Sequence, residues 1–295
     1  IPLMITACIS FAVDYYLDPD SIYTKKLREK GELKAESKMA TRIAADGLVE
    51  IRKDGDLTAM IEVNSETDFV AKNDMFQEYV ADAALVALMH NGEVCDMKTF
   101  QCPKVHKSFE ERLTDLIAKI GENMNLRRAA MLEVSNGVIA SYVHNACKPN
   151  LGKIGVLVAL ESNGDKAKLQ ELGKHIAMHV AASNPQFLTI ADVDQASIDH
   201  EKAIFSEQAK ASGKPENIIE KMVEGRIKKY FDEVVLEEQA YIMDPDKKVK
   251  QIVADAAKEM GADIKLKAFV CFRLGEGLEK RNEDFAAEVA SQLKK

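Results

Sequence analysis

The sequence has few of the features that mark disulfide-rich, zinc-binding or membrane-spanning proteins. Its 295 residues include five cysteines, an odd number, and no two of them form a CxxC pair. A disulfide framework or a structural zinc site is therefore not expected, and a reducing compartment fits this cysteine usage. The longest apolar stretch near a terminus, residues 1–13, is shorter than the roughly 20 residues that span a bilayer.

Residues 1–13 also make a poor signal peptide, because no basic residue precedes them. The chain begins with Ile1 rather than Met, so one interpretation of this stretch is the remnant of a longer leader. We favour the other interpretation, an N-terminal helix or strand that is shielded from solvent. We expect the protein to be cytoplasmic.

Neither sign of charge is in large excess. The chain has 40 basic and 48 acidic residues, which gives a net charge of −8. Proteins that mainly bind nucleic acid or anionic lipid carry a basic surface, so we expect neither as the direct partner. Apolar residues make up 46% of the chain, enough to build cores, and the length predicts about two domains.

Motifs for phosphate binding and for metal catalysis are also missing. No GxxxxGK(S/T) phosphate loop occurs. His175 and His179 stand at i and i+4, as metal ligands do on a helix, but Ile176 occupies the place of the general-base Glu of zinc proteases. We therefore expect no metal, no cofactor and no catalytic residue. If the protein is an enzyme, the alternative is a metal-dependent hydrolase that uses these two histidines as metal ligands.

What the chain does contain is a repeated order of strands and helices. Residues 48–51 and 57–63 have strand character, with a turn at 53–56, and a helix is expected over 75–89. The same order recurs as a strand pair at 137–143 and 153–160, followed by a helix at 167–182.

Short sequence similarities support the repeat. Asp46-Gly47-Leu48 parallels Asn136-Gly137-Val138, and Met60–Val63 parallels Val156–Ala159. We therefore predict an α+β fold with two related antiparallel sheet-plus-helix core subdomains.

A helical hairpin is expected to interrupt the second subdomain. After Asn184-Pro185 the strand pattern stops, and two stripes of apolar residues at helical spacing flank Ser212–Pro215. Gly213 suits the end of the first helix and Pro215 the start of the second. The apolar stripe is only partly covered by the hairpin itself, which favours contact with a partner or a second copy of the chain.

The expected segments then follow in order. They are an N-terminal helical segment (1–42), core subdomain N (43–136), the first part of core subdomain C (137–189), the helical hairpin (190–231), the second part of core subdomain C (232–277) and a C-terminal helix (278–295).

One loop stands out, because it is apolar where a loop tip is usually polar. Residues 65–74 join a predicted strand to a helix, and Thr67 and Asp68 suit a helix N-terminus. Phe69 and Val70 follow directly. The pattern alone favours a Phe69 ring that packs into its own core. The alternative is a rigidly presented aromatic side chain that inserts into a partner protein.

Several motifs, taken together and in this order, resemble those of the bacterial elongation factor Ts family. They are Thr67–Asn73, Lys119–Arg128, His175–Ala182, Ser212–Pro215, Lys221–Arg226 and Asp284–Val289. The first 19 residues do not fit, since the family opens with a three-helix module whose Thr-Gly-Ala-Gly pattern is missing here. Only Leu27–Gly31 matches the end of that module, so the N-terminus is atypical.

The resemblance implies a guanine-nucleotide exchange factor for elongation factor Tu in translation, which acts by binding and is not an enzyme. Asp68 and Phe69 would reach the partner near its Mg²⁺ and phosphate-binding loops, with Thr67 and Val70 shaping the turn. Further contacts would come from three other positions, Ile120, Gly121 and His144.

Two other functional classes remain as alternatives. The basic stretch Lys25–Lys38 suggests a ribosome- or RNA-binding module, although the acidic total argues against it. A dimerising scaffold through the helical hairpin is the other, and a homodimer formed in this way is compatible with exchange activity.

Overall fold

The computed structural model of the protein describes residues 42–102, 106–210 and 216–278. Within these ranges the chain is a mixture of helices and antiparallel strands, which confirms the predicted α+β class. The helices expected in residues 1–41 and 282–293, and the turn at 212–215, lie outside the described residues.

The strands and helices have the following bounds. The strands are β1 (Asp46–Asp54), β2 (Leu57–Ser65), β3 (Gln101–Cys102), β4 (Lys107–Ser108), β5 (Met124–Glu133), β6 (Gly137–His144), β7 (Leu151–Gly152), β8 (Ile154–Glu161), β9 (Ala240–Tyr241), β10 (Asp244–Lys248) and β11 (Lys265–Arg273). The helices are α3 (Asp74–Met89), α4 (Val94–Thr99), α5 (Phe109–Ile120), α6 (Lys166–Ser183), α7 (Gln195–Lys210), α8 (Glu216–Val234) and α9 (Val249–Met260), with 3₁₀ turns η1 (Val70–Lys72), η2 (Ile190–Asp192) and η3 (Leu236–Glu238).

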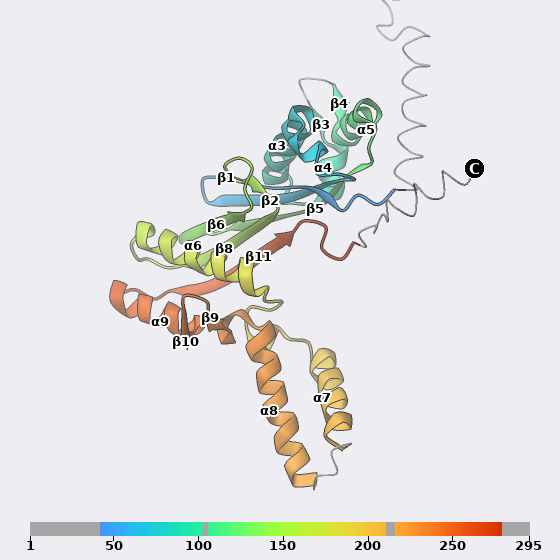
Figure 1. The fold of residues 1–295 in the computed structure, drawn as a ribbon. Coiled ribbons are helices and arrows are strands. Elements are labelled where there is room, and N and C mark those ends of the chain that lie inside the picture. The colour runs from blue at the N-terminus through green and yellow to red at the C-terminus, as the bar shows by residue number, and fades with distance from the viewer. Residues whose placement is uncertain (1–41, 103–105, 211–215, 279–295) are drawn as a thin grey trace, which may run out of the picture.

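Two antiparallel sheets pack face to face between two layers of helices. The first sheet has the order β5-β2-β1-β7 and the second the order β11-β8-β6. α3, α4 and α5 cover the outer face of the first sheet, and α6 and α9 cover the outer face of the second (Figure 1). Val49, Met60 and Leu157 are among the fully buried side chains between the sheets. Both sheets are therefore covered on two sides.

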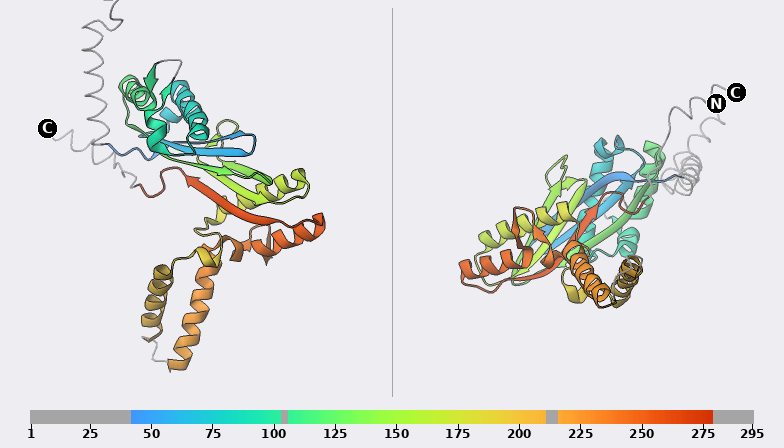
Figure 2. Two further views of the ribbon diagram at one scale, coloured as in Figure 1. Left: turned by 180° about the vertical axis from the view of Figure 1, so that it is seen from behind. Right: turned by 60° about the horizontal axis from the view of Figure 1, so that its bottom comes forward.

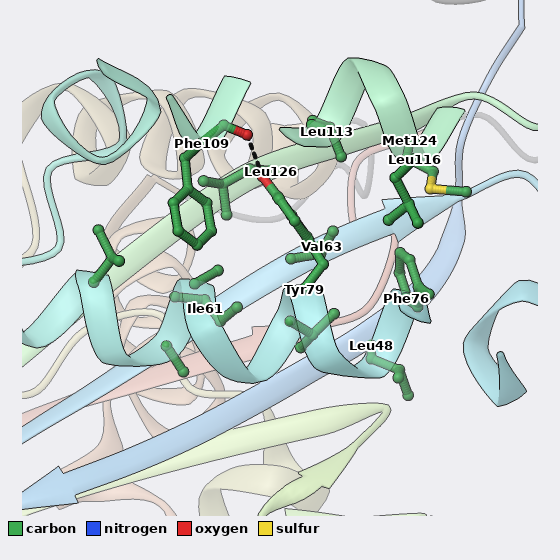
Figure 3. Packing of buried hydrophobic residues seen from close by; sticks show 14 of the residues in the cluster. Leu48, Ile61, Val63, Phe76, Tyr79, Phe109, Leu113, Leu116, Met124 and Leu126 are labelled. Atoms are coloured by element: carbon green, nitrogen blue, oxygen red, sulfur yellow. Dashed lines mark hydrogen bonds between the residues drawn. The ribbon is translucent and has the colours of Figure 1, made fainter. Parts of the chain in front are cut away.

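The core between the first sheet and its helices is rich in large side chains (Figure 3). Tyr79 on α3 packs against Phe109 of α5, with the ring centres 5.1 Å apart, and the Tyr79 hydroxyl donates to the Phe109 carbonyl oxygen at 3.4 Å. Phe76, also on α3, lies at the other end of the cluster, near Leu116 and Met124. Full burial of one such side chain contributes roughly 1.5–3 kcal/mol. This packing gives α3 and α5, which flank the loop described below, a firm base.

The expected repeat is present, but its register differs by one residue from the prediction. Gly47 pairs with Asn64 in the first hairpin, and Gly137 pairs with Glu161 in the second. Met60–Val63 therefore corresponds to Leu157–Leu160 rather than to Val156–Ala159. The prediction was wrong because these strands are nearly continuous apolar runs, whose pattern does not define which residue faces which side.

The helical hairpin projects from the second sheet, as Figures 1 and 2 show from several sides. α7 and α8 pack against each other, and α8 continues to Val234, slightly beyond the expected end at 231. At the base, the Gln186 N–H donates to the Val234 carbonyl oxygen at 2.8 Å, and Phe187 forms a bridge with Val235. The hairpin is thus joined to the core by main-chain hydrogen bonds.

Candidate functional site

The loop between β2 and α3, residues 65–73, presents an aromatic ring to solvent. We call it the Phe69 loop. The Phe69 side chain is 75% exposed, whereas the next residue, Val70, is 4% exposed and packs into the core under α3. Asn73 ends the loop, and its side chain accepts from the Met75 and Phe76 N–H groups to cap α3. An exposed ring therefore stands on a loop that is anchored on both sides.

The expectation that Phe69 packs into its own core is wrong. Phe69 precedes η1, and neighbouring residues of a tight helical turn point in different directions. Val70 and Ala71 occupy the core positions, so the ring of Phe69 is directed outward. The sequence pattern could not decide which of two adjacent apolar residues enters the core.

A basic side chain lies beside the ring and pairs with an acidic one. The Lys72 ammonium nitrogen lies 5.7 Å from the centre of the Phe69 ring and 3.6 Å from the Asp68 carboxylate. An ion pair this exposed contributes at most about 1 kcal/mol. Asp68, Phe69 and Lys72 thus form a small acidic, aromatic and basic surface that remains open to a binding partner.

The structure brings the Phe69 loop next to the end of α5. The Glu122 carboxylate accepts from the Thr67 N–H at 3.0 Å and from the Thr67 hydroxyl at 2.8 Å. Ile120 is half-buried against the core, and Gly121 ends α5 with φ +92°. Of the predicted contact residues, Thr67–Val70 and Ile120–Gly121 therefore lie in one region.

His144 is not part of this region. It stands at the end of β6 in the second sheet, is exposed, and its ring contacts Tyr142, with the Tyr142 oxygen 3.1 Å from Nδ1. Among the described residues, no hydrogen bond or ring contact joins His144 to the Phe69 loop.

Two carboxylates that hold the loop were not predicted from the sequence. Glu66 accepts from the Asn123 N–H, and Glu122 accepts from Thr67. Glu66 directly precedes the motif Thr67–Asn73, and Glu122 lies inside the motif Lys119–Arg128, next to Gly121. A signal was available, since Glu122 follows a glycine suited to end a helix, but pairing two segments needs the three-dimensional structure.

A buried carboxylate ties down β2, the strand that leads into the Phe69 loop. Glu62 is fully buried, 3.0 Å from Arg127 and also paired with Arg128. Burial by itself raises the pKa of Glu62, but hydrogen bonds from the Gly275 N–H, from Asn64 and from Arg128 outweigh it and hold the pKa below its usual 4.5. Glu62 therefore stays ionised and joins β2, β5 and the chain after β11.

The two histidines of α6 do not form a metal site. His179 is buried, its Nε2 lies 2.9 Å from Gln239 Oε1, and its Nδ1 accepts from the Ile242 N–H at 3.2 Å. Both ring nitrogens are thus occupied by the protein, and burial lowers the pKa of His179 below 6.5. Within the described ranges, no group of three or more His, Cys, Asp or Glu side chains is arranged to hold a metal ion.

Two further observations concern membrane-spanning segments and the RNA-binding alternative. Each helix within the described part of the chain is too short or too polar to serve as a membrane-spanning segment. The basic stretch Lys25–Lys38, which suggested an RNA-binding module, lies outside the described residues.

Comparison with known proteins gives one consistent answer. A sequence model of the family described as Elongation factor TS matches residues 66–276. Elongation factor Ts of Paramagnetospirillum magneticum is 55% identical over 266 residues, which cover 90% of this chain and 85% of that protein. Elongation factor Ts of Rhodospirillum rubrum is 54% identical over 270 residues, 91% of this chain and 87% of that protein. The residues matched by the family model include most of the Phe69 loop, the end of α5 and the helical hairpin.

Proposed function

The chain belongs to the elongation factor Ts family and is a nucleotide exchange factor of translation elongation, and we propose that it promotes GDP release from elongation factor Tu by inserting the Phe69 loop. The observation that carries this proposal is the exposure of Phe69. Its side chain is 75% exposed, although the next residue of the loop, Val70, is buried. Aromatic side chains presented in this way are common anchors at protein interfaces. The proposed target is the region of the partner that holds Mg²⁺ and the nucleotide phosphates.

The proposed mechanism needs no covalent chemistry. A nucleotide held by a phosphate loop and Mg²⁺ leaves slowly, and an exchange factor accelerates release by binding the nucleotide-free partner more tightly than the loaded one. Insertion of Phe69, with Asp68 beside it, would displace the segments that hold the metal and the phosphates. An affinity difference of about 100-fold corresponds to roughly 2.7 kcal/mol, which one buried aromatic anchor can supply.

The other predicted contacts belong to the same proposal. Thr67 and Val70 shape the turn, while Ile120 and Gly121 at the end of α5 lie beside the loop and would extend the contact surface. His144 would touch the partner at a second place, because it lies on the other sheet. We expect Ile120 and His144 to contribute less than Phe69.

Three further expectations remain proposals. We propose that the helical hairpin, α7 and α8, contacts another part of the partner or mediates a homodimer. We also propose that the segment boundaries given above, including subdomain N (43–136) and the interrupted subdomain C, describe the domain organisation. Family membership supports the expected cytoplasmic location.

The test of the proposed function is the release of labelled GDP from purified elongation factor Tu, followed by stopped flow with and without this chain. We expect a strong, concentration-dependent acceleration that saturates. A relative of the family, such as the Rhodospirillum rubrum protein, serves as positive control. If the relative accelerates release and this chain does not, the proposal is wrong.

A further inference from the structure

We propose that Glu122 is a positioning residue, which holds the Phe69 loop in one orientation before the partner binds. This inference rests on the proposed function, because it concerns the same loop and the same contact. Glu122 itself is half-buried and is hydrogen-bonded to Thr67, two residues before Phe69, so its effect would be exerted through Thr67.

The geometry at Thr67 supports this role. One carboxylate accepts two hydrogen bonds from a single residue, from the Thr67 N–H at 3.0 Å and from the Thr67 hydroxyl at 2.8 Å. A bond to the main chain and a bond to the side chain together restrict both the position and the rotation of that residue. Since Thr67 is two residues before Phe69, this restriction extends to the base of the ring. Hydrogen bonds to an ionised acceptor are also stronger than those between neutral groups.

A second carboxylate makes the connection reciprocal. Glu66, on the loop side, accepts from the Asn123 N–H, and Glu122, on the α5 side, accepts from Thr67. In the loop, Glu66 accepts and Thr67 donates. After α5, Glu122 accepts and Asn123 donates. The Arg42 guanidinium lies 3.3 Å from Glu66, which neutralises part of the acidic charge gathered there. We refer to Glu66, Thr67, Glu122 and Asn123 as the carboxylate clamp.

The clamp is attached to a rigid helix. α5 begins with a capping box between Ser108 and Glu111 and packs into the core through Leu113, Leu116 and Ile117. It ends at Gly121, whose φ of +92° turns the chain so that Glu122 reaches back to Thr67. Without the clamp, Val70, Asn73 and the Ser65 hydroxyl, which donates to the Thr67 carbonyl oxygen at 3.0 Å, would still attach the loop. The Thr67 N–H and side chain would be released, and residues 66–69 would gain freedom that binding must then remove.

The first test measures the loop without any partner. The chain contains no tryptophan, so Phe69→Trp introduces a single indole side chain at the site as a fluorescent probe. In this background we compare Glu122→Ala with Glu93→Ala, which removes an exposed carboxylate at the start of α4. Time-resolved anisotropy of the indole should show a larger fast component in Glu122→Ala and no change in Glu93→Ala.

A second variant covers the case in which Glu122→Ala does not fold. Thr67→Val removes the hydroxyl donor but keeps the shape of the side chain and the Glu122 carboxylate. We expect it to increase the fast motion of the indole probe by a smaller amount, since one of two hydrogen bonds remains. If circular dichroism shows folded variants and the probe moves as in the parent in both, the proposal is overturned.

The second test uses the exchange reaction in the protein with Phe69 intact. We expect Glu122→Ala to raise the concentration for half-maximal GDP release about tenfold and to leave the maximal rate unchanged, because a looser loop still contains the same ring. A positioning role is contradicted if Glu122→Ala lowers the maximal rate of GDP release and leaves the half-maximal concentration unchanged. The anisotropy result does not depend on exchange activity, so failure of the clamp and failure of the proposed function are distinguishable.

Discussion

Gly47 and Gly137 occupy equivalent positions in the two halves of the core, and neither leaves room for a side chain. A Cβ atom at Gly47 would lie 2.1 Å from the Val63 carbonyl oxygen, and one at Gly137 would lie 1.9 Å from the Leu160 carbonyl oxygen. Both residues have positive φ, +129° and +152°. Each lies at the start of the first strand of its hairpin, β1 or β6. The two halves of the core therefore share the backbone conformation at this position as well as the order of their strands and helices.

We predict that Gly137→Ala destabilises the protein by about 3 kcal/mol or more, because the new methyl group meets a main-chain oxygen at a strained φ. Urea unfolding followed by circular dichroism measures this loss. Gly225→Ala is the matched control, since no atom lies within 4 Å of a Cβ there and the residue is inside α8. It should raise the free energy of unfolding by about 0.5–1 kcal/mol. Equal effects of the two substitutions would contradict this account.

We predict that Glu62→Gln lowers the free energy of unfolding at pH 7 by about 2–3 kcal/mol, since a buried carboxylate is lost from two arginines that can still reach solvent. The pKa of Glu62 is lower in the folded than in the unfolded protein. Its contribution is therefore present above about pH 4.5 and disappears as the pH falls through the folded pKa. The difference between wild type and variant should shrink below pH 4.5. A difference that stays constant as the pH falls well below this value would show that the charge is unimportant.

A third prediction concerns His179, whose pKa is lowered by burial. Between the folded pKa and 6.5 the unfolded chain binds the proton and the folded chain does not, so stability should fall as the pH drops below about 6.5. His179→Ala should remove part of this decline, whereas His175→Ala, at a half-buried site, should retain it. Thermal unfolding at a series of pH values on both sides of 6.5 measures both. An unchanged pH dependence in His179→Ala would refute the assignment.

Sequence periodicity located much of the fold, and its failures have physical causes. β5 was not predicted, because Ala129 faces the core under α3 while Ala130 and Leu132 face the second sheet, so both sides are apolar. A register shift opposite Glu62 and Val63 further disturbs the alternation. α5 was also missed, although Ser108 and Glu111 carry a capping-box signal.

The candidate site was only partly accessible from the sequence. The motif around Phe69 identified the loop, but the pattern could not determine whether Phe69 or Val70 enters the core. That choice depends on the turn η1, which places Val70 and Ala71 inward. The contact between Thr67 and Glu122 joins residues far apart in the chain, and no local pattern predicts it.

The most direct test of the proposed mechanism is stopped-flow release of labelled GDP from elongation factor Tu with wild type and with Phe69→Ala. Because the ring is 75% exposed, the substitution should leave thermal unfolding unchanged. We predict a loss of exchange activity of about 100-fold, the factor that roughly 2.7 kcal/mol of anchor energy supplies. If a folded Phe69→Ala variant releases GDP at the wild-type rate, this chain does not act by inserting the Phe69 ring.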